Sequence, residues 1–234
     1  MRRISGARPA RAGKARPAHG ARRRRVADAA IATVTAVALC SGIWLVRDGT
    51  EGHLPPQPSA AQADDAASAG PGTGGEAPAA PPLPPSPPDR IRIPAIRVNA
   101  PLIGLGLTSS GSLEAPPPEQ KNVAGWYEAG TKPGETGTAV VAGHVDDAEG
   151  PAVFYNLGAL KKGNTIEMDR RDGSVAVFTV DAIDVFDSRN FPDEKVYGAA
   201  RRPELRVITC GGGYSKKTGY QGNVVVFAHL TGSH

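Results

Sequence analysis

The sequence predicts a mainly-β fold, a barrel or a sandwich, for residues 89–234 of the 234-residue chain. Short segments rich in β-branched and aromatic residues recur about eight times there, as strands do. Glycine and proline clusters separate these segments, and only residues 152–160, which follow Gly150-Pro151, are a good helix candidate. This part of the chain is long enough for one domain with its own core.

The predicted strands follow from local composition and, in part, from alternation of apolar and charged positions. Pro94 lies inside the first of them and predicts an edge or bulged strand there. The predicted strands are 91–98, 100–107, 123–127, 137–143, 165–169, 174–186, 204–210 and 223–230.

Residues 1–25 form a basic tail with ten Lys or Arg and no acid. Taking these ten from the 27 basic residues of the chain leaves 17, against 23 acidic residues. The formal charge of +4 is therefore +10 in the tail and −6 in the remainder. Because the positive charge lies in the tail, it is no reason to predict that the folded part binds nucleic acid.

Residues 26–47 are predicted to form a transmembrane signal anchor. Positions 29–46 carry no charge, which is near the lower length limit for a membrane-spanning helix. Arg22 to Arg25 directly precede this segment, so the positive-inside rule predicts a cytoplasmic tail and an extracellular domain in the cell membrane. A cleaved signal peptide is the alternative, although no clear small-residue cleavage site follows. Cys40, inside the segment, is interpreted as a packing residue.

Residues 48–88 predict a disordered linker. Eleven of the 22 prolines lie between Gly49 and Pro88, with many Ala, Gly and Ser. Such a composition cannot bury enough apolar surface to fold, and its proline-rich end favours extended polyproline geometry. We interpret it as a spacer between the membrane and the domain; a proline-rich recognition ligand is the alternative.

Cys210 is the first candidate for chemistry. It follows a predicted strand and precedes three glycines, so an approaching substrate can reach its sulfur. Exported domains normally pair their cysteines, because the compartment is oxidising, yet Cys210 has no partner within residues 89–234. An unpaired thiol in that compartment is a candidate nucleophile. A small buried residue at a strand end is the alternative interpretation.

His144 is the second candidate. It also ends a predicted strand, directly after Gly143, and imidazole is the usual acid or base partner of a thiol. The remaining histidines lie where no chemistry is indicated. They are His19 in the tail, His53 in the linker, His229 at the end of an apolar strand and His234 at the last position.

Several segments resemble the sortase family, and the likeness covers nearly all of residues 90–230. The three signature regions are similar to Ala142-Gly-His-Val-Asp146, Val207-Ile-Thr-Cys-Gly-Gly212 and Asn223-Val-Val-Val-Phe-Ala228. Segments 94–102, 133–137 and 191–198 resemble the intervening family sequence, and the closest likeness is to the class F sortases of actinobacteria. The preceding anchor and spacer also fit the topology of that family.

The resemblance implies an eight-stranded β-barrel with one or two short helices and the activity of a cysteine transpeptidase, a thiol-protease-like enzyme. Cys210 would attack a sorting signal of the Leu-Pro-x-Thr-Gly type, and His144 would protonate the leaving amine. An amine from a cell-wall precursor or a pilin would then resolve the thioacyl intermediate. The family's substrate groove is lined by the loop before the Cys strand, here Phe191-Pro192 and Val196-Tyr197, although these residues could equally pack on the barrel.

The chain departs from the family at the third catalytic residue. An Arg is expected two residues before Asn223, where this chain has Gln221. The amide of Gln221, the backbone N–H groups of Gly211 and Gly212, or the side chain of Arg206 could replace it. Arg206 lies about 13 Å from Cys210 along an extended strand, which makes it the weaker candidate.

Two other functions remain open from the sequence. One is an exported cysteine peptidase that only hydrolyses, and the other is a sortase-fold binding module that has lost activity with the Arg. The sequence contains no metal cluster, phosphate loop or dinucleotide fingerprint, so we predict no cofactor. The loop acids Asp146, Asp147 and Glu149 lack a calcium-binding spacing and are interpreted as solvated.

Overall fold

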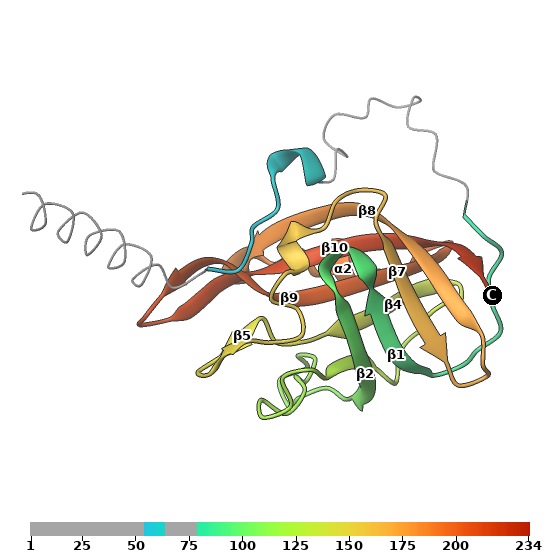
Figure 1. Cartoon of the computed structure of the whole chain (residues 1–234), viewed down its shortest axis with the longest axis horizontal. Helices are drawn as coiled ribbons and strands as arrows, with labels where there is room; N and C mark the ends of the chain where they lie inside the picture. Colours follow the sequence, from blue (N-terminus) through green and yellow to red (C-terminus); the bar gives the residue numbers. More distant parts are fainter. Residues whose placement is uncertain (1–53, 64–78) are drawn as a thin grey trace, which may run out of the picture. The chain divides into compact units, whose positions relative to one another are not determined.

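Eight strands close into a barrel in the computed structural model of the chain, which describes residues 54–63 and 79–234 (Figure 1). Around the barrel the order is β1-β2-β3-β4-β9-β10-β8-β7. This confirms the prediction of a mainly-β, eight-stranded barrel. The strands are β1 Pro88–Ile93, β2 Val98–Leu105, β3 Ala124–Tyr127, β4 Gly137–Ala142, β7 Thr165–Arg170, β8 Val175–Asp187, β9 Pro203–Ser215 and β10 Gly219–Ser233.

The remaining elements of the described part are short. A two-stranded ribbon pairs β5 (Asp146–Asp147) with β6 (Gly150–Pro151). The one α-helix in the described residues, α2, spans Asp193–Tyr197 in the connection between β8 and β9. Single 3₁₀ turns occur at Ala60–Gln62, Pro94–Ile96, Leu157–Ala159 and Ser188–Asn190.

The predicted helix at 152–160 is wrong. Only Leu157–Ala159 is helical there, as one 3₁₀ turn. The N–H of Ala152 donates to the carbonyl of Val145, and the N–H of Phe154 donates to that of His144. These bonds tie the segment to the chain after β4 and leave no helical ladder. Phe154 and Leu157 are fully buried, so the apolar positions fill the core instead of forming a helix face.

The predicted single strand 91–98 is in fact two strands joined by a turn. Pro94–Ile96 forms a 3₁₀ turn, and Arg97 adopts the left-handed conformation at φ 56°. The N–H of Arg97 donates to the carbonyl of Pro94 and closes the turn. Pro94 therefore ends β1 and starts a reversal into β2, where Ile93 pairs with Val98.

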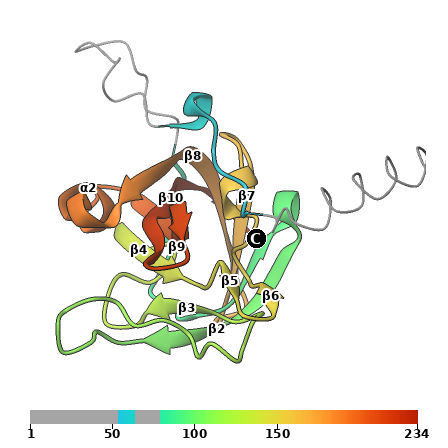
Figure 2. The same ribbon diagram turned by 90° about the vertical axis from the view of Figure 1, so that its left-hand side faces the viewer.

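Alternate residues of β9 divide the sheet into an inner and an outer face. Leu205 and Val207 point into the barrel core, whereas Ile208 belongs to a second apolar group outside it. This second group, here called the outer cluster, lies under α2, which flanks β4, β9 and β10 in Figure 2. Its buried members are Val140, Ala182, Val196, Ile208, Val225 and Phe227.

The barrel contacts begin before residue 89, within the segment predicted as linker. The N–H of Ala80 donates to the carbonyl of Leu230, and the N–H of Leu83 donates to that of Gly134. Ser86 is buried and accepts from the N–H of Asp172. Residues 79–88 therefore pack on the folded domain.

A second part of the predicted linker, residues 54–63, also contacts the barrel. Pro55 is buried, and the side-chain oxygen of Gln62 accepts from the N–H of Lys162 at 2.7 Å. The predicted tail (1–25) and anchor (26–47) lie outside the described residues. Within residues 54–63 and 79–234, no helix is long and apolar enough to cross a membrane.

We expect a chain beginning at residue 79 to be more stable than one beginning at residue 89. The shorter chain loses the bonds of Ala80, Leu83 and Ser86, and the guanidinium of Arg170, whose side chain is 1% exposed, loses the carbonyl of Pro84. At a net value of about 1 kcal/mol per hydrogen bond, the loss is about 2–4 kcal/mol and roughly 5–15 °C in the unfolding midpoint. Circular dichroism melts of both chains measure it, and equal midpoints would show that residues 79–88 do not stabilise the fold.

Candidate active site

Cys210 and His144 lie just beyond the point where the pairing of two neighbouring parallel strands ends, although β9 itself continues past Cys210 to Ser215. Ala142 of β4 pairs with Ile208 of β9, and two residues further along each strand come His144 and Cys210. The N–H of Gly143 still donates to the carbonyl of Ile208, at 3.2 Å, and the hydroxyl of Thr209 donates to the carbonyl of Gly143, at 2.8 Å. The structure therefore brings together the two residues that the sequence singled out.

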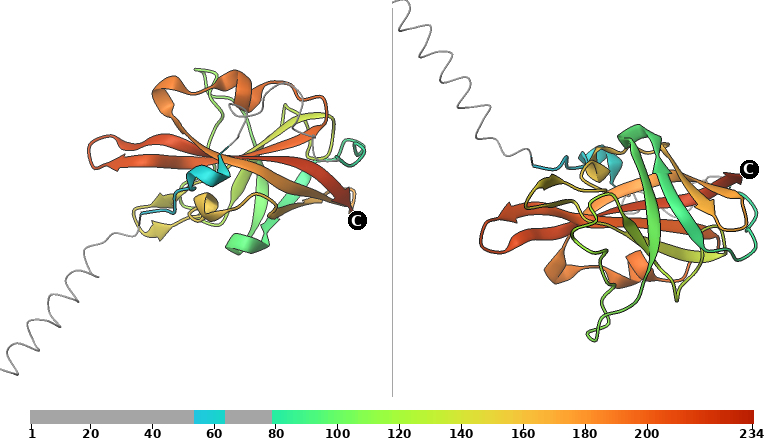
Figure 3. Two further views of the ribbon diagram at one scale, coloured as in Figure 1. Left: turned by 90° about the horizontal axis from the view of Figure 1, so that it is seen from above. Right: turned by 60° about the horizontal axis from the view of Figure 1, so that its bottom comes forward.

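Cys210 is a free, exposed thiol near the start of the hairpin that joins β9 to β10, which extends beyond the barrel in Figure 3. Gly211 is required next to it, because a Cβ there would lie 2.5 Å from a methyl group of Val224. Gly212 adopts a φ of 75° and gives β9 one extra residue against β10. The strand thus bends directly after the sulfur.

The thiol of Cys210 needs a base at neutral pH. Loss of water around the sulfur raises the pKa of Cys210, and the negative charge of Asp146 raises it further. Because the thiolate is the nucleophilic form, a thiol with a raised pKa reacts only if a neighbouring group takes its proton.

His144 can take that proton through one specific nitrogen. Its Nε2 lies 2.7 Å from the carbonyl oxygen of Pro116, in the loop between β2 and β3. A carbonyl oxygen only accepts, so Nε2 carries a hydrogen, and Nδ1 is the nitrogen that can take a proton whenever the ring is neutral. Among the described residues no hydrogen bond joins His144 to Cys210. The β2–β3 loop therefore holds the imidazole next to the end of β4 with its Nε2 occupied.

Asp146 and Asp147 are partly buried, which corrects the interpretation of them as solvated, whereas Glu149 is solvated as predicted, with its side chain 82% exposed. The hydroxyl of Tyr220 donates to the carboxylate of Asp146, and burial together with this contact raises the pKa of Tyr220. Lys121 bridges Asp147 and Glu149, at 3.1 Å each. Within residues 54–63 and 79–234, no three His, Cys, Asp or Glu side chains are grouped so that they could hold a metal ion.

Arg206 is held away from the thiol. Its side chain is 8% exposed, donates to Glu204 at 2.7 Å and stacks over the ring of Phe227 at 4.6 Å. Glu204 lies two residues before Arg206, on the side opposite to Cys210. The guanidinium therefore stabilises the outer face of the sheet and does not extend to the sulfur.

The four predicted groove residues have different surroundings. Val196 is fully buried in the outer cluster and fixes α2 to the sheet. Phe191 is half-buried against Phe186, with ring centroids 5.9 Å apart, and Tyr197 is 45% exposed beside it. Pro192 is half-buried at the start of α2. Of the four, Val196 packs on the barrel as the alternative interpretation stated, and the other three have accessible surface.

The side chain of Asn223, which the sequence analysis did not consider as a site residue, lies opposite Cys210. Asn223 of β10 is the direct cross-strand partner of Cys210, whereas Gln221 lies two residues further toward the hairpin tip and is exposed. The extra residue in β9 at Gly212 changes the register there. A count along β10 alone cannot reveal that register, so the sequence did not indicate which side chain faces the thiol.

We expect Asp146→Asn to shift the alkylation of Cys210 to lower pH. The carboxylate of Asp146 disfavours the thiolate, so removing its charge lowers the pKa of the thiol and raises the thiolate fraction at neutral pH. The asparagine oxygen can still accept from Tyr220. The pH profile of iodoacetamide labelling measures the shift, with Asp147→Asn, whose carboxylate pairs with Lys121, as the matched control. Identical profiles for Asp146→Asn and the unchanged chain would contradict the charge effect.

An accessible thiol and an imidazole at neighbouring strands of an eight-stranded barrel are the groups of a cysteine-dependent catalytic site. Residues 91–231, more than half of the chain, match the family model described as "Sortase domain", so the chain belongs to the sortase family. Sortases are cysteine transpeptidases. No curated protein matches the chain.

Solved structures with a similar fold include sortases of types A and C. "Sortase A from Corynebacterium diphtheriae, lid mutant" is 21% identical, with a TM-score of 0.46, over 61% of this chain and 69% of that one. Sortase A from Listeria monocytogenes is 20% identical, with a TM-score of 0.45, over 62% and 87%. Sortase C-1 from Actinomyces oris is 21% identical, with a TM-score of 0.48, over 61% and 73%.

Proposed function

We propose that this chain is a membrane-anchored transpeptidase that cleaves an exported protein at a Leu-Pro-x-Thr-Gly-like sorting signal and transfers it to an amine. The observation that carries the proposal is that His144 and Cys210 each lie two residues beyond the last pair, Ala142 with Ile208, of the parallel strands β4 and β9. Membership of the sortase family supports the reaction type. The motifs quoted from the sequence favour the class F subtype of actinobacteria.

The first half-reaction forms a thioester. Nδ1 of His144 takes the proton of the Cys210 thiol, and the sulfur attacks the carbonyl carbon of the scissile peptide bond. The resulting tetrahedral oxyanion collapses, the C–N bond breaks, and His144 returns the proton to the leaving amine. An incoming amine then attacks the thioester and releases the thiol. Dividing one acyl transfer into two steps replaces one high activation barrier with two lower ones.

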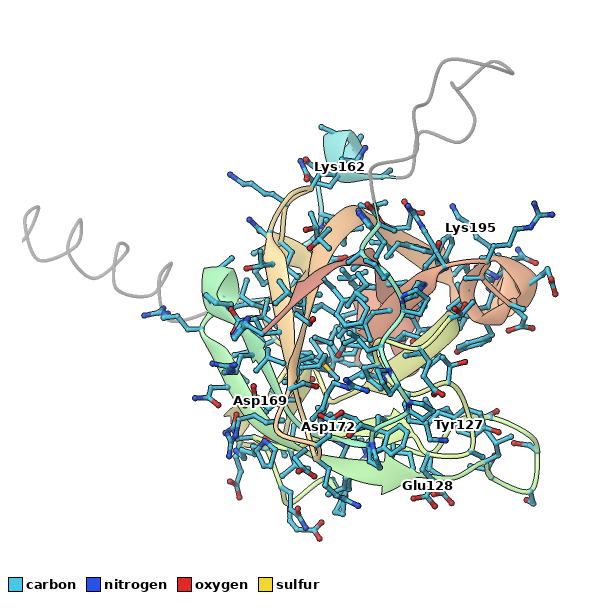
Figure 4. All side chains as sticks on the ribbon, turned by 90° about the vertical axis from the view of Figure 1, so that its right-hand side faces the viewer. Tyr127, Glu128, Lys162, Asp169, Asp172 and Lys195 are labelled. Carbon is cyan, nitrogen blue, oxygen red and sulfur yellow. The ribbon has the colours of Figure 1, made fainter. Side chains whose placement is uncertain are left out.

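The outer face of the sheet, beside α2, is where the sorting signal would bind. Lys195 of α2, labelled in Figure 4, donates to Asp184 at 3.0 Å and lies over the rings of Phe186 and Phe227. These contacts hold the β8–β9 connection against β8 and β10, the second of which pairs with the strand that carries Cys210. Phe191 and Tyr197 leave apolar ring surface accessible there, which suits a Leu-Pro pair.

The predicted anchor sets the partners and the location in this proposal. A positive tail at 1–25 followed by an uncharged segment supports a cytoplasmic N-terminus, contact with membrane lipid and an extracellular catalytic domain. The acyl donor would then be an exported protein, and the acceptor an amine of a cell-wall precursor or a pilin. Neither nucleic acid nor a cofactor has a role in the reaction.

Product analysis tests the function. The purified full-length chain is incubated with a library of sorting-signal peptides, with and without an added amine such as triglycine, and the products are weighed by mass spectrometry. A new amide to the added amine is the expected result. Hydrolysis products alone would replace the transpeptidase with a cysteine peptidase. Binding of peptides without any cleavage would replace it with a binding module.

A further inference from the structure

Asn223 lies in the last of three cross-strand pairs on the outer face of β9 and β10. The first pair, Arg206 and Phe227, is in contact, because the guanidinium lies 4.6 Å from the ring centroid. Both members of the second pair belong to the outer cluster. Continuing with period two, the third pair lies on the same face. The pairs are Arg206 with Phe227, Ile208 with Val225, and Cys210 with Asn223.

The pairing gives the amide of Asn223 a short distance to the site of attack. Directly opposite residues of an antiparallel pair have Cβ atoms roughly 4.5–5.5 Å apart. The carboxamide extends about two bonds beyond its Cβ, so its N–H groups can reach an oxygen formed next to the sulfur. Cys210 and Asn223 thus lie side by side in β9 and β10, and His144 follows the end of the adjacent β4 at the same level.

The amide of Asn223 is also available. The residue is half-buried, and its side chain makes no hydrogen bond with any other described residue. Its competitors are less well placed, because Arg206 donates to Glu204 and Gln221 lies on the exposed arm of the hairpin. A neutral donor with a free N–H next to the nucleophile is the chemistry that stabilises a developing oxyanion.

We propose that Asn223 donates its side-chain N–H to the tetrahedral oxyanion on Cys210 and takes the place of the family's Arg; the inference rests on the proposed acyl-transfer function. When the sulfur attacks, the C=O electron pair moves onto oxygen, and the N–H of Asn223 binds that charge. When the pair returns to re-form C=O, the bond to the leaving group breaks, and the hydrogen bond weakens. The amide transfers no proton and is unchanged at the end of the step.

If Asn223 has this role, its removal should slow one reaction of the Cys210 thiol and leave another almost unchanged. Acylation of Cys210 by p-nitrophenyl acetate passes through an oxyanion and releases nitrophenolate, whereas alkylation by iodoacetamide displaces iodide without one. We expect Asn223→Ala to slow acylation of the full-length chain by ~10²–10³-fold, the usual loss for one oxyanion donor. Alkylation should stay within about threefold, because a neutral amide alters the thiol's charge environment little.

Two further variants keep this test decisive. Asn223→Leu keeps nearly the size of Asn but has no donor, so it should slow acylation as Asn223→Ala does. It serves as the test if Asn223→Ala destabilises the fold. Gln221→Ala is the matched amide deletion and should leave acylation within about threefold. Unchanged acylation in both Asn223 variants would overturn the inference, as would an equal fall of acylation and alkylation, or a larger loss in Gln221→Ala.

The activated ester separates this inference from the proposed function. If the unchanged chain reacts with the ester and is slowed by Asn223→Ala, but cleaves no peptide, the donor role stands and the peptide substrate is rejected. If the unchanged chain and Asn223→Ala cleave peptides equally fast, the function stands and the donor role is rejected. A thiol that neither the ester nor any peptide acylates rejects both.

Discussion

Replacing Cys210 by alanine should abolish peptide cleavage while leaving the barrel folded. The sulfur is the only proposed nucleophile, and loss of a catalytic nucleophile lowers the rate by at least about 10⁴-fold in enzymes that form an acyl intermediate. Cys210 is exposed, so the substitution should change the free energy of unfolding by less than about 0.5 kcal/mol. Initial rates of sorting-peptide cleavage and a thermal melt measure the two effects.

The chain supplies its own control for this experiment. Its second cysteine, Cys40, lies in the predicted anchor, and Cys40→Ala should retain the full rate. Mass analysis of the quenched unchanged chain should also find the acyl group on the peptide that contains Cys210. Retained cleavage in Cys210→Ala, or an acyl group on any other residue, would reject the covalent mechanism.

Most strands of the barrel could be predicted because the composition of each short segment is enough to indicate a strand. Segments 137–143 and 204–210 have β-branched composition and are followed or ended by Gly, and both lie in strands of the barrel, β4 and β9. The predicted end at Cys210 is wrong, because β9 continues through the glycines to Ser215. Cys210 and His144 were found for a related reason, since each stands at the end of such a strand. Nothing in the sequence alone showed that β4 and β9 are parallel neighbours; only the resemblance to a family implied it.

The failures share a cause as well, which is long-range packing. Residues 152–160 have a helical composition, but the N–H groups of Ala152 and Phe154 bond to the chain after β4, and Phe154 and Leu157 enter the core. Residues 79–88 look unfoldable by themselves, yet they bond to Leu230 and Gly134, far away in sequence. Composition indicates which structure a segment forms in isolation. It does not reveal the hydrogen bonds and apolar contacts that the segment makes with the rest of the barrel.

The pairing of Cys210 with Asn223 could not be predicted for a more specific reason. The family Arg was sought by counting two residues back from Asn223 along one strand, which led to Gln221. The side chain opposite the thiol depends on the pairing of two strands, and the extra residue at Gly212 sets that pairing in the hairpin. Glycine at a positive φ is a local signal for such a bulge, but three consecutive glycines do not show which of them takes it.

His144→Ala should lower the cleavage rate by several orders of magnitude. General acid–base catalysis by one side chain contributes ~10²–10⁴-fold, and in the proposed mechanism a single imidazole both takes the thiol proton and protonates the leaving amine. The raised pKa of Cys210 makes the first of these roles necessary at neutral pH. The rate of peptide cleavage against pH measures the loss, and added imidazole should restore part of it by entering the vacated space.

His144→Gln separates this proton transfer from a purely structural role. Glutamine can still donate to the carbonyl of Pro116 and hold the β2–β3 loop, as Nε2 of His144 does, but it cannot carry a proton. We therefore expect His144→Gln to be nearly as slow as His144→Ala, while His234→Ala, at the exposed end of the chain, keeps the full rate. If His144→Gln were nearly as active as the unchanged chain, the imidazole would only position the loop, and another group would have to take the proton from Cys210.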